Sequence, residues 1–284
     1  MKRKATRIWY KLWSRAAPRE KTSAAGLVVS PFVTTAPMRA LLDWRPDWKT
    51  EAVGRILGHR AGTFVDIGAN VGQSLSDFVL APVRSTYVGF EPNLICYQHL
   101  AKLVADNALH QCHVVPAGLG DRNGIVELYR YGGDVDAGTT TVRELRPRLE
   151  VVADSGCVFR LDDIGDRIPE PEISLIKIDV EGSEIEVLRG MRSTIERTRP
   201  WILCEVLHRD LFAEPEPYRQ RCAELIRLVV GMGYVVLHVV QDDQGASIKG
   251  LETVDAFPDS VWHEEDSLFA CDYLFVPEGD SGAA

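Results

Sequence analysis

Short apolar runs recur along the chain from residue 63 onward, and stretches with helical spacing of apolar positions separate them. The pattern predicts a strand ending at residue 66 and strands over residues 87–90, 113–116, 173–178, 201–206, 235–240 and 273–276, with helices over residues 73–80, 94–107, 184–197 and 218–230. Such alternation is typical of a doubly wound α/β fold with a mostly parallel sheet. We expect the last two strands to form an antiparallel pair at the sheet edge.

Several segments depart from this alternation. Residues 1–24 form a basic arm, and residues 25–60 are expected to cap the fold. The main domain, residues 61–276, contains an insertion at residues 120–160, where paired glycines and short β-like runs predict hairpins or another ordered excursion rather than a helix. This β-rich insertion is a candidate wall of a substrate site. Residues 277–284 are expected to be disordered.

The first candidate site is the sequence Asp66-Ile67-Gly68-Ala69-Asn70-Val71-Gly72, which follows a strand. Its glycines permit positive φ and close approach to a ligand, and the first amides of the next helix can meet polar ligand atoms. The dinucleotide fingerprint requires a third glycine where Gln73 stands, so NAD is disfavoured. Asp66 suits a cofactor with a cationic amine, which points to S-adenosylmethionine (SAM). The alternative is a glycine turn that only packs tightly.

A second acidic strand end lies one β-α-β unit downstream, at Glu91. A carboxylate there can accept hydrogen bonds from both hydroxyls of a ribose, and Pro92 fits the first turn of the following helix. The alternative is a solvated glutamate at a helix start. The spacing from Asp66 favours the ribose role.

A third strand ends in Asp179 and is followed by Glu181 and Glu184. Like charges held close together cost free energy unless a proton, a cation or hydrogen bonds offset them, so such clusters tend to be functional. Glu184 is better explained as a helix-start charge that the helix dipole favours.

Together these blocks carry a family resemblance. DIGANVG begins at Asp66, GFEP ends at Pro92, Leu161-Asp162-Asp163 follows, and IKIDVEGSEIEVLRG and RPWILCEV come last. In this order the chain resembles the FkbM family of SAM-dependent methyltransferases over roughly residues 60–210. The resemblance implies a class I methyltransferase (Rossmann-like) fold with a seven-stranded sheet and an antiparallel edge strand. It also implies methyl transfer, usually to a hydroxyl oxygen of a sugar, glycan or polyketide-type natural product.

The cofactor-binding residues expected on this basis are Asp66, Gly68, Ala69, Asn70, Gly72, Glu91, Pro92, Ala117 and Leu119. Class I methyltransferases often carry glycine where Asn70 stands. Asparagine tolerates left-handed backbone geometry better than most residues, so the loop can keep its shape.

An alcohol is a poor nucleophile, so a base should assist methyl transfer. The candidates are Asp179, Glu181, Glu205 and His208. His208 has a suitable unperturbed pKa, although a surface histidine in the turn that it begins is the simpler explanation. The carboxylates could instead hold a divalent cation, with Asp179 as the ligand. A noncatalytic SAM-fold interaction module is the main alternative to an enzyme, and a dinucleotide-dependent oxidoreductase is disfavoured by the glycine spacing.

Composition adds limits to this picture. The chain has 284 residues, 45% of them hydrophobic, which suffices for one domain with appendages. Its 6 cysteines are scattered without a CxxC pair, as in reduced core positions of a cytoplasmic protein, and its 7 histidines lack zinc-site spacing.

Charge is unevenly distributed. Residues 1–21 contain eight Lys or Arg and one Glu, a net charge of +7, so the rest carries −16 to reach the total of −9. With Trp9 and Trp13, this arm matches an interfacial anchor at the inner face of a membrane, or else its aromatic residues pack on the body. Nucleic acid is disfavoured because the acidic body repels phosphate. The expected partner is a small-molecule or glycan acceptor.

Overall fold

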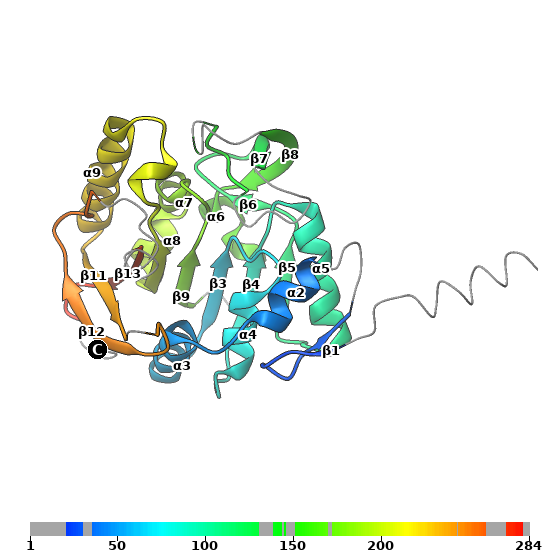
Figure 1. The fold of residues 1–284 in the computed structure, drawn as a ribbon. Helices are drawn as coiled ribbons and strands as arrows, with labels where there is room; N and C mark the ends of the chain where they lie inside the picture. The colour runs from blue at the N-terminus through cyan, green and yellow to red at the C-terminus, as the bar shows by residue number, and fades with distance from the viewer. Residues whose placement is uncertain are drawn as a thin grey trace, which may run out of the picture.

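The computed structural model describes residues 21–30, 36–130, 139–143, 145, 151–169, 172–242, 244–259 and 271–280. Its central sheet consists of β3 (Thr63–Ile67), β4 (Thr86–Phe90), β5 (Cys112–Val115), β9 (Ile173–Ile178), β10 (Trp201–Glu205), β11 (Tyr234–Gln241), β12 (Ile248–Thr253) and β13 (Asp272–Pro277). Their order across the sheet is β12-β11-β13-β10-β9-β3-β4-β5 (Figure 1).

The five strands from β10 to β5 run parallel to one another, whereas β13 is antiparallel to both of its neighbours, β10 and β11. This arrangement confirms the predicted class I methyltransferase fold. In the described part of the chain the sheet has eight strands rather than seven, because β12 pairs antiparallel with β11 and forms the edge. The sequence IKGLET of β12 lacks a regular apolar alternation, which is why its pattern did not indicate a strand.

Helices cover both faces of the sheet. One face carries α2 (Ala36–Asp43), α3 (Trp48–His59), α4 (Gln73–Leu80) and α5 (Leu94–Asp106), and the other carries α6 (Leu161–Ile164), α7 (Glu184–Gly190), α8 (Arg192–Thr198) and α9 (Pro215–Gly231). Short 3-10 helices follow at Gly165–Arg167 and Arg209–Leu211. The helix predicted over residues 184–197 is interrupted at Met191, which ends α7 and precedes α8. Strands β3, β4 and β9 are buried on both faces, as their continuous apolar runs require.

The segment before β3 packs on the sheet as a cap. Its hairpin of β1 (Lys21–Thr22) and β2 (Val28–Val29) is tied to the end of α5, because the Val28 amide donates to Asn107 Oδ1 at 2.7 Å. Helix α3 starts with a capping box at Asp47 and buries Trp48, Val53 and Leu57 against the sheet. The region 25–60 therefore contributes to one of the two main cores.

Three further strands form a small sheet in the order β6-β8-β7, made of β6 (Gly118–Leu119), β7 (Gly124–Arg130) and β8 (Val152–Phe159). Strands β7 and β8 are an antiparallel pair, as the turn signals of the insertion predicted. Figure 1 shows this sheet beyond the end of the central sheet toward which β3 and β4 point. Its apolar side carries Val126, Leu128 and Val158.

The chain ends differ in how far the structure describes them. Residues 1–20 lie outside the described residues, so the basic arm and its membrane contact stay predictions. Pro277 belongs to β13, and Asp280 accepts a hydrogen bond from the Trp201 indole at 3.1 Å, so the disordered tail predicted from residue 277 is wrong for residues 277–280. Among the described residues, no helix has the length and apolarity needed to cross a membrane.

Candidate active site

The glycine loop between β3 and α4 takes the left-handed geometry that its sequence predicted. Gly68, Asn70 and Gly72 have φ of 83°, 47° and 109°. The amides of Gly68 and Ala69 both donate to the carbonyl oxygen of Phe90 at 3.0 Å. A Cβ on Gly68 would lie 1.8 Å from the carbonyl oxygen of Asp179, so only glycine allows this loop to meet the end of β9.

Glu91, just after β4, is buried and fixed by two backbone amides. Its Oε2 accepts from Asn70 at 2.8 Å, and its Oε1 accepts from Asn93 at 2.7 Å. Burial raises the pKa of Glu91 to about 7, although the two amide hydrogen bonds oppose this effect. The carboxyl group is therefore held rigidly between the loops that follow β3 and β4.

These loops and the small sheet enclose a hollow at the carboxyl ends of the strands, where open α/β sheets bind ligands. Its lining consists of Ile67, Gly68, Asn70, Glu91, Pro92, Gly118, Leu119, Leu128, Thr139, Thr140, Thr141, Val158, Asp179, Val180 and Ser183. Five of the predicted cofactor residues are in this set, namely Gly68, Asn70, Glu91, Pro92 and Leu119. Asp179, predicted as catalytic, lines it as well.

Four predicted cofactor residues do not line the hollow. Ala69 and Ala117 are buried beside it, and Gly72 packs against Leu100 and Leu103 of α5. Asp66 is fully buried, and its Oδ2 accepts from the Tyr87 hydroxyl at 2.6 Å. Asp66 does not line the hollow, and its direct contact with a cofactor amine stays a prediction.

Lys177, on β9, contacts both Asp66 of β3 and Asp179, the residue that follows β9. Its Nζ lies 2.8 Å from Asp179 Oδ2 and 3.7 Å from Asp66 Oδ1. Burial disfavours its charge, but Asp179 and Asp66 outweigh burial and raise the pKa of Lys177 above its ordinary value. Sequence reasoning missed this residue, although a lysine inside a buried strand was a visible signal.

The pKa values of Asp179 and Glu205 are shifted in opposite directions. Burial opposes ionisation of Asp179, but Lys177 and Lys49 hold its pKa below the ordinary value. The charge of Asp179, together with burial and Asp272, raises the pKa of Glu205 to about 8. At neutral pH Asp179 is therefore ionised and Glu205 is largely protonated.

The other two catalytic candidates are placed differently. Glu181 has a left-handed backbone with φ of 54° and is half-buried in the loop after β9. His208 is buried with 3% of its surface exposed, so the expectation of a surface histidine is wrong. Neither residue lines the hollow.

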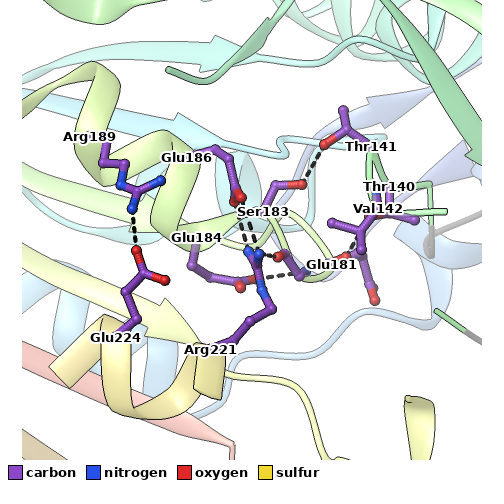
Figure 2. A network of polar contacts seen from close by, with 11 residues as sticks. Thr140, Thr141, Val142, Glu181, Ser183, Glu184, Glu186, Arg189, Arg221 and Glu224 are labelled. Carbon is purple, nitrogen blue, oxygen red and sulfur yellow. Dashed lines mark hydrogen bonds and ion pairs between the residues drawn. The ribbon is translucent and has the colours of Figure 1, made fainter. Parts of the chain in front are cut away.

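Figure 2 shows the loop after β9 held from two sides. Thr140 Oγ1 donates to the Glu181 carbonyl at 2.6 Å, and the hydroxyls of Thr141 and Ser183 lie 2.6 Å apart. From α9, Arg221 donates to the Gly182 carbonyl at 2.6 Å. Residues 139–141 thereby form part of one wall of the hollow, within the insertion that the sequence indicated as a candidate wall of a substrate site.

Glu184 has a structural role, as predicted. It starts α7 and accepts from the Gly182 amide at 2.8 Å. Burial raises its pKa to about 7. Its carboxyl group stabilises the turn that leads from the acid cluster into the helix.

The described residues contain no group of three or more His, Cys, Asp or Glu side chains arranged to hold a metal ion. The cysteines in the described part of the chain form no disulfide with one another, and five of them are buried, namely Cys96, Cys112, Cys204, Cys222 and Cys271.

Comparison with known proteins places these features in a family. The sequence profile of the Methyltransferase FkbM domain matches residues 66–236, which is more than half of the chain. The curated 2-O-methyltransferase NoeI of Sinorhizobium fredii (strain NBRC 101917 / NGR234) is 27% identical over 168 residues, covering 55% of this chain and 67% of that protein.

Two solved structures are also similar to this chain. A methyltransferase FkbM from Methylobacillus flagellatus KT is 18% identical to this chain, with a TM-score of 0.44. The match covers 85% of this chain and 51% of that protein, so this chain spans about half of its length. The O-methyltransferase TomG from Streptomyces achromogenes is 13% identical with a TM-score of 0.46, covering 95% of each chain. Because the profile spans the glycine loop, Glu91 and the acid cluster, the chain belongs to the FkbM family of methyltransferases.

Proposed function

We propose that the protein transfers a methyl group from SAM to a hydroxyl oxygen of a sugar, glycan or polyketide-type natural product. One observation carries this proposal: a single hollow brings Glu91 and Asn70 together with the ionised carboxylate of Asp179. The first two residues suit the cofactor, and the third suits the removal of a proton.

The polar groups of the hollow fit SAM. Asn70 Oδ1 is buried, and no described residue donates a hydrogen bond to it. An unsatisfied buried acceptor costs free energy, and the ammonium group of SAM would satisfy it. Each oxygen of Glu91 accepts one amide and retains capacity for a ribose hydroxyl. Leu119, Leu128 and Val158 offer an apolar wall that suits an adenine ring.

SAM supplies an electrophilic methyl group on sulfur. The protein must then hold the acceptor oxygen in line and take its proton. Asp179 is the candidate for this role because it lines the hollow and is ionised. Glu205, on the neighbouring strand, lies outside the lining and is a second proton acceptor only when it is itself deprotonated.

Hydroxyl acceptors are supported by the chemistry of this site and by one relative. Carboxylates accept hydrogen bonds from hydroxyl groups, and the relative NoeI is a 2-O-methyltransferase. A divalent cation is not required by this scheme, because Lys177 already offsets the charge of Asp179.

The test is methyl transfer from SAM with a radiolabelled methyl group to a panel of neutral sugars, oligosaccharides and hydroxylated polyketides. We expect S-adenosylhomocysteine to form together with a labelled product, and mass spectrometry should locate the methyl group on oxygen. Methylation on nitrogen or carbon would contradict the hydroxyl assignment. SAM binding without transfer across the panel would favour the noncatalytic interaction module.

A further inference from the structure

Lys49 belongs to the cap segment and extends toward the carboxylates of Asp272, Glu205 and Asp179. It lies outside residues 66–236, which the family profile matches. It is the second residue of α3, and its backbone amide donates to the capping Asp47 Oδ1 at 2.7 Å. The neighbouring Trp48 is buried and anchors this end of the helix. Lys49 Nζ lies 3.3 Å from Oδ1 of Asp272, which begins β13.

Asp272 lies beside the carboxylates of the site. It is directly opposite Glu205 in the antiparallel pairing of β10 and β13. Asp272 is buried, and its second oxygen accepts from Gln241 Nε2 at 3.4 Å. A negative charge on Asp272 thus faces a carboxyl group that is already next to Asp179, and like charges in such proximity oppose one another.

Two lysines offset the negative charges of these carboxylates. Lys177 pairs with Asp179 and Asp66, and Lys49 pairs with Asp272. Lys49 retains 26% of its side-chain exposure, but its neighbours Asp272, Glu205, Asp179 and Asp47 raise its pKa above the ordinary value despite the opposing effect of burial. It therefore remains charged whenever the cluster is.

We propose that Lys49 is a positioning residue of the methyl-transfer site: its pairing with Asp272 offsets the charge beside Glu205 and Asp179 and keeps a carboxylate available as proton acceptor. This inference rests on the proposed function, because a proton acceptor is needed only if a hydroxyl group is methylated. It gives the cap segment a chemical role in addition to packing.

The direction of the effect follows from the groups that face Glu205. Asp179, Asp272 and Glu181 raise its pKa, and Lys49 lowers it. Lys177 is paired with Asp179, which is itself one of these groups. The Cys271 thiol lies 3.9 Å from Glu205 Oε1. Removing the charge of Lys49 should therefore move the titration of Glu205 to higher pH, whereas removing the charge of Asp272 should move it to lower pH.

The experiment is a carboxyl NMR titration of the full chain carrying isotope-labelled glutamate, with the Glu205 signal assigned by its loss in Glu205→Gln. We expect Lys49→Met to raise the Glu205 midpoint by at least about one pH unit, as for removal of a nearby opposite charge. Asp272→Asn should lower the midpoint, and Lys49→Arg should leave it near the wild-type value. An ion pair that only holds α3 to β13, without acting on Glu205, would leave the Glu205 midpoint unchanged in both charge-removing variants.

Methyl transfer provides a second readout with the acceptor that the panel identifies. The acidic limb of the kcat/KM profile should move to higher pH in Lys49→Met and return in Lys49→Arg. Unchanged Glu205 midpoints in both Lys49→Met and Asp272→Asn would overturn the inference. If Lys49→Met does not fold, the Glu205 midpoint of Asp272→Asn alone decides between the two outcomes. The NMR result does not depend on turnover. Failure of the proposed function would be seen as wild-type protein that binds SAM without transferring its methyl group, and this outcome is distinct from unchanged Glu205 midpoints.

Discussion

The α-carbon of Gly68 faces the carbonyl oxygen of Asp179 so closely that a Cβ would lie 1.8 Å from that oxygen. This contact joins the end of β3 to the end of β9. The amide of Asp179 also donates to the carbonyl of Ile67 at 3.0 Å. Backbone contacts therefore fix the position of the glycine loop after β3 relative to Asp179 at the end of β9.

Gly68→Ala should lower the free energy of unfolding by about 2–4 kcal/mol, from left-handed strain together with overpacking. Urea denaturation measures this change. Gly58→Ala is the matched control, because Gly58 lies in α3 with nothing within 4 Å of its added Cβ, and it should stabilise the protein by about 0.5–1 kcal/mol. Equal stability of wild type and Gly68→Ala would show that the two loops can separate at little cost.

Lys177→Met should destabilise the fold by about 3–5 kcal/mol near pH 7, because it leaves Asp66 and Asp179 without their buried cation. Lys102→Met, which breaks a partly exposed pair with Asp106, should cost less than about 1 kcal/mol. Both values come from the same denaturation experiment. Similar losses in the two variants would mean that Lys177 is not a buried counter-ion of consequence.

The sequence predicted the central fold and the acidic strand ends because both leave periodic signals. Gly68, Glu91 and Asp179 each follow a continuous apolar run, so their common location at one sheet edge could be predicted. Residues 139–141 could not be placed in the same way, because Thr140 meets Glu181 across 41 positions of sequence through a single hydroxyl. The burial of Asp66 against Tyr87 and Lys177 was equally hidden, since both partners lie on other strands.

Asp77 should make stability depend on pH. It is buried in α4, Thr50 Oγ1 donates to its Oδ1 at 2.5 Å, and burial raises its pKa from 3.8 to about 7. Between these values the native state binds more protons than the unfolded chain, so this group lowers stability as pH rises. Asp77→Asn, which keeps the acceptor oxygen, should gain at least about 1 kcal/mol relative to wild type between pH 5 and pH 8. Parallel stability curves of the two proteins over this range would refute the assignment.

Asp179→Asn should reduce the rate of methyl transfer by at least about a hundredfold, the lower end for general acid–base catalysis, while SAM affinity changes little. The exposed Asp121→Asn is the control and should retain the wild-type rate. Rates with added Mg²⁺ or with a chelator separate a base from a metal ligand. A fully active Asp179→Asn protein would transfer the proton-accepting role to Glu205, His208 or solvent.

Calorimetric titration with SAM tests the central claim most directly, namely that the hollow around Glu91 binds this cofactor. Wild-type protein should bind SAM and S-adenosylhomocysteine but not NAD. Glu91→Ala should weaken SAM binding by about 10- to 100-fold, which corresponds to the loss of hydrogen bonds to a charged group. The exposed Glu252→Ala on β12 should leave the affinity unchanged. SAM binding of equal strength in wild type and a folded Glu91→Ala variant, or no SAM binding by the wild type, would contradict the account.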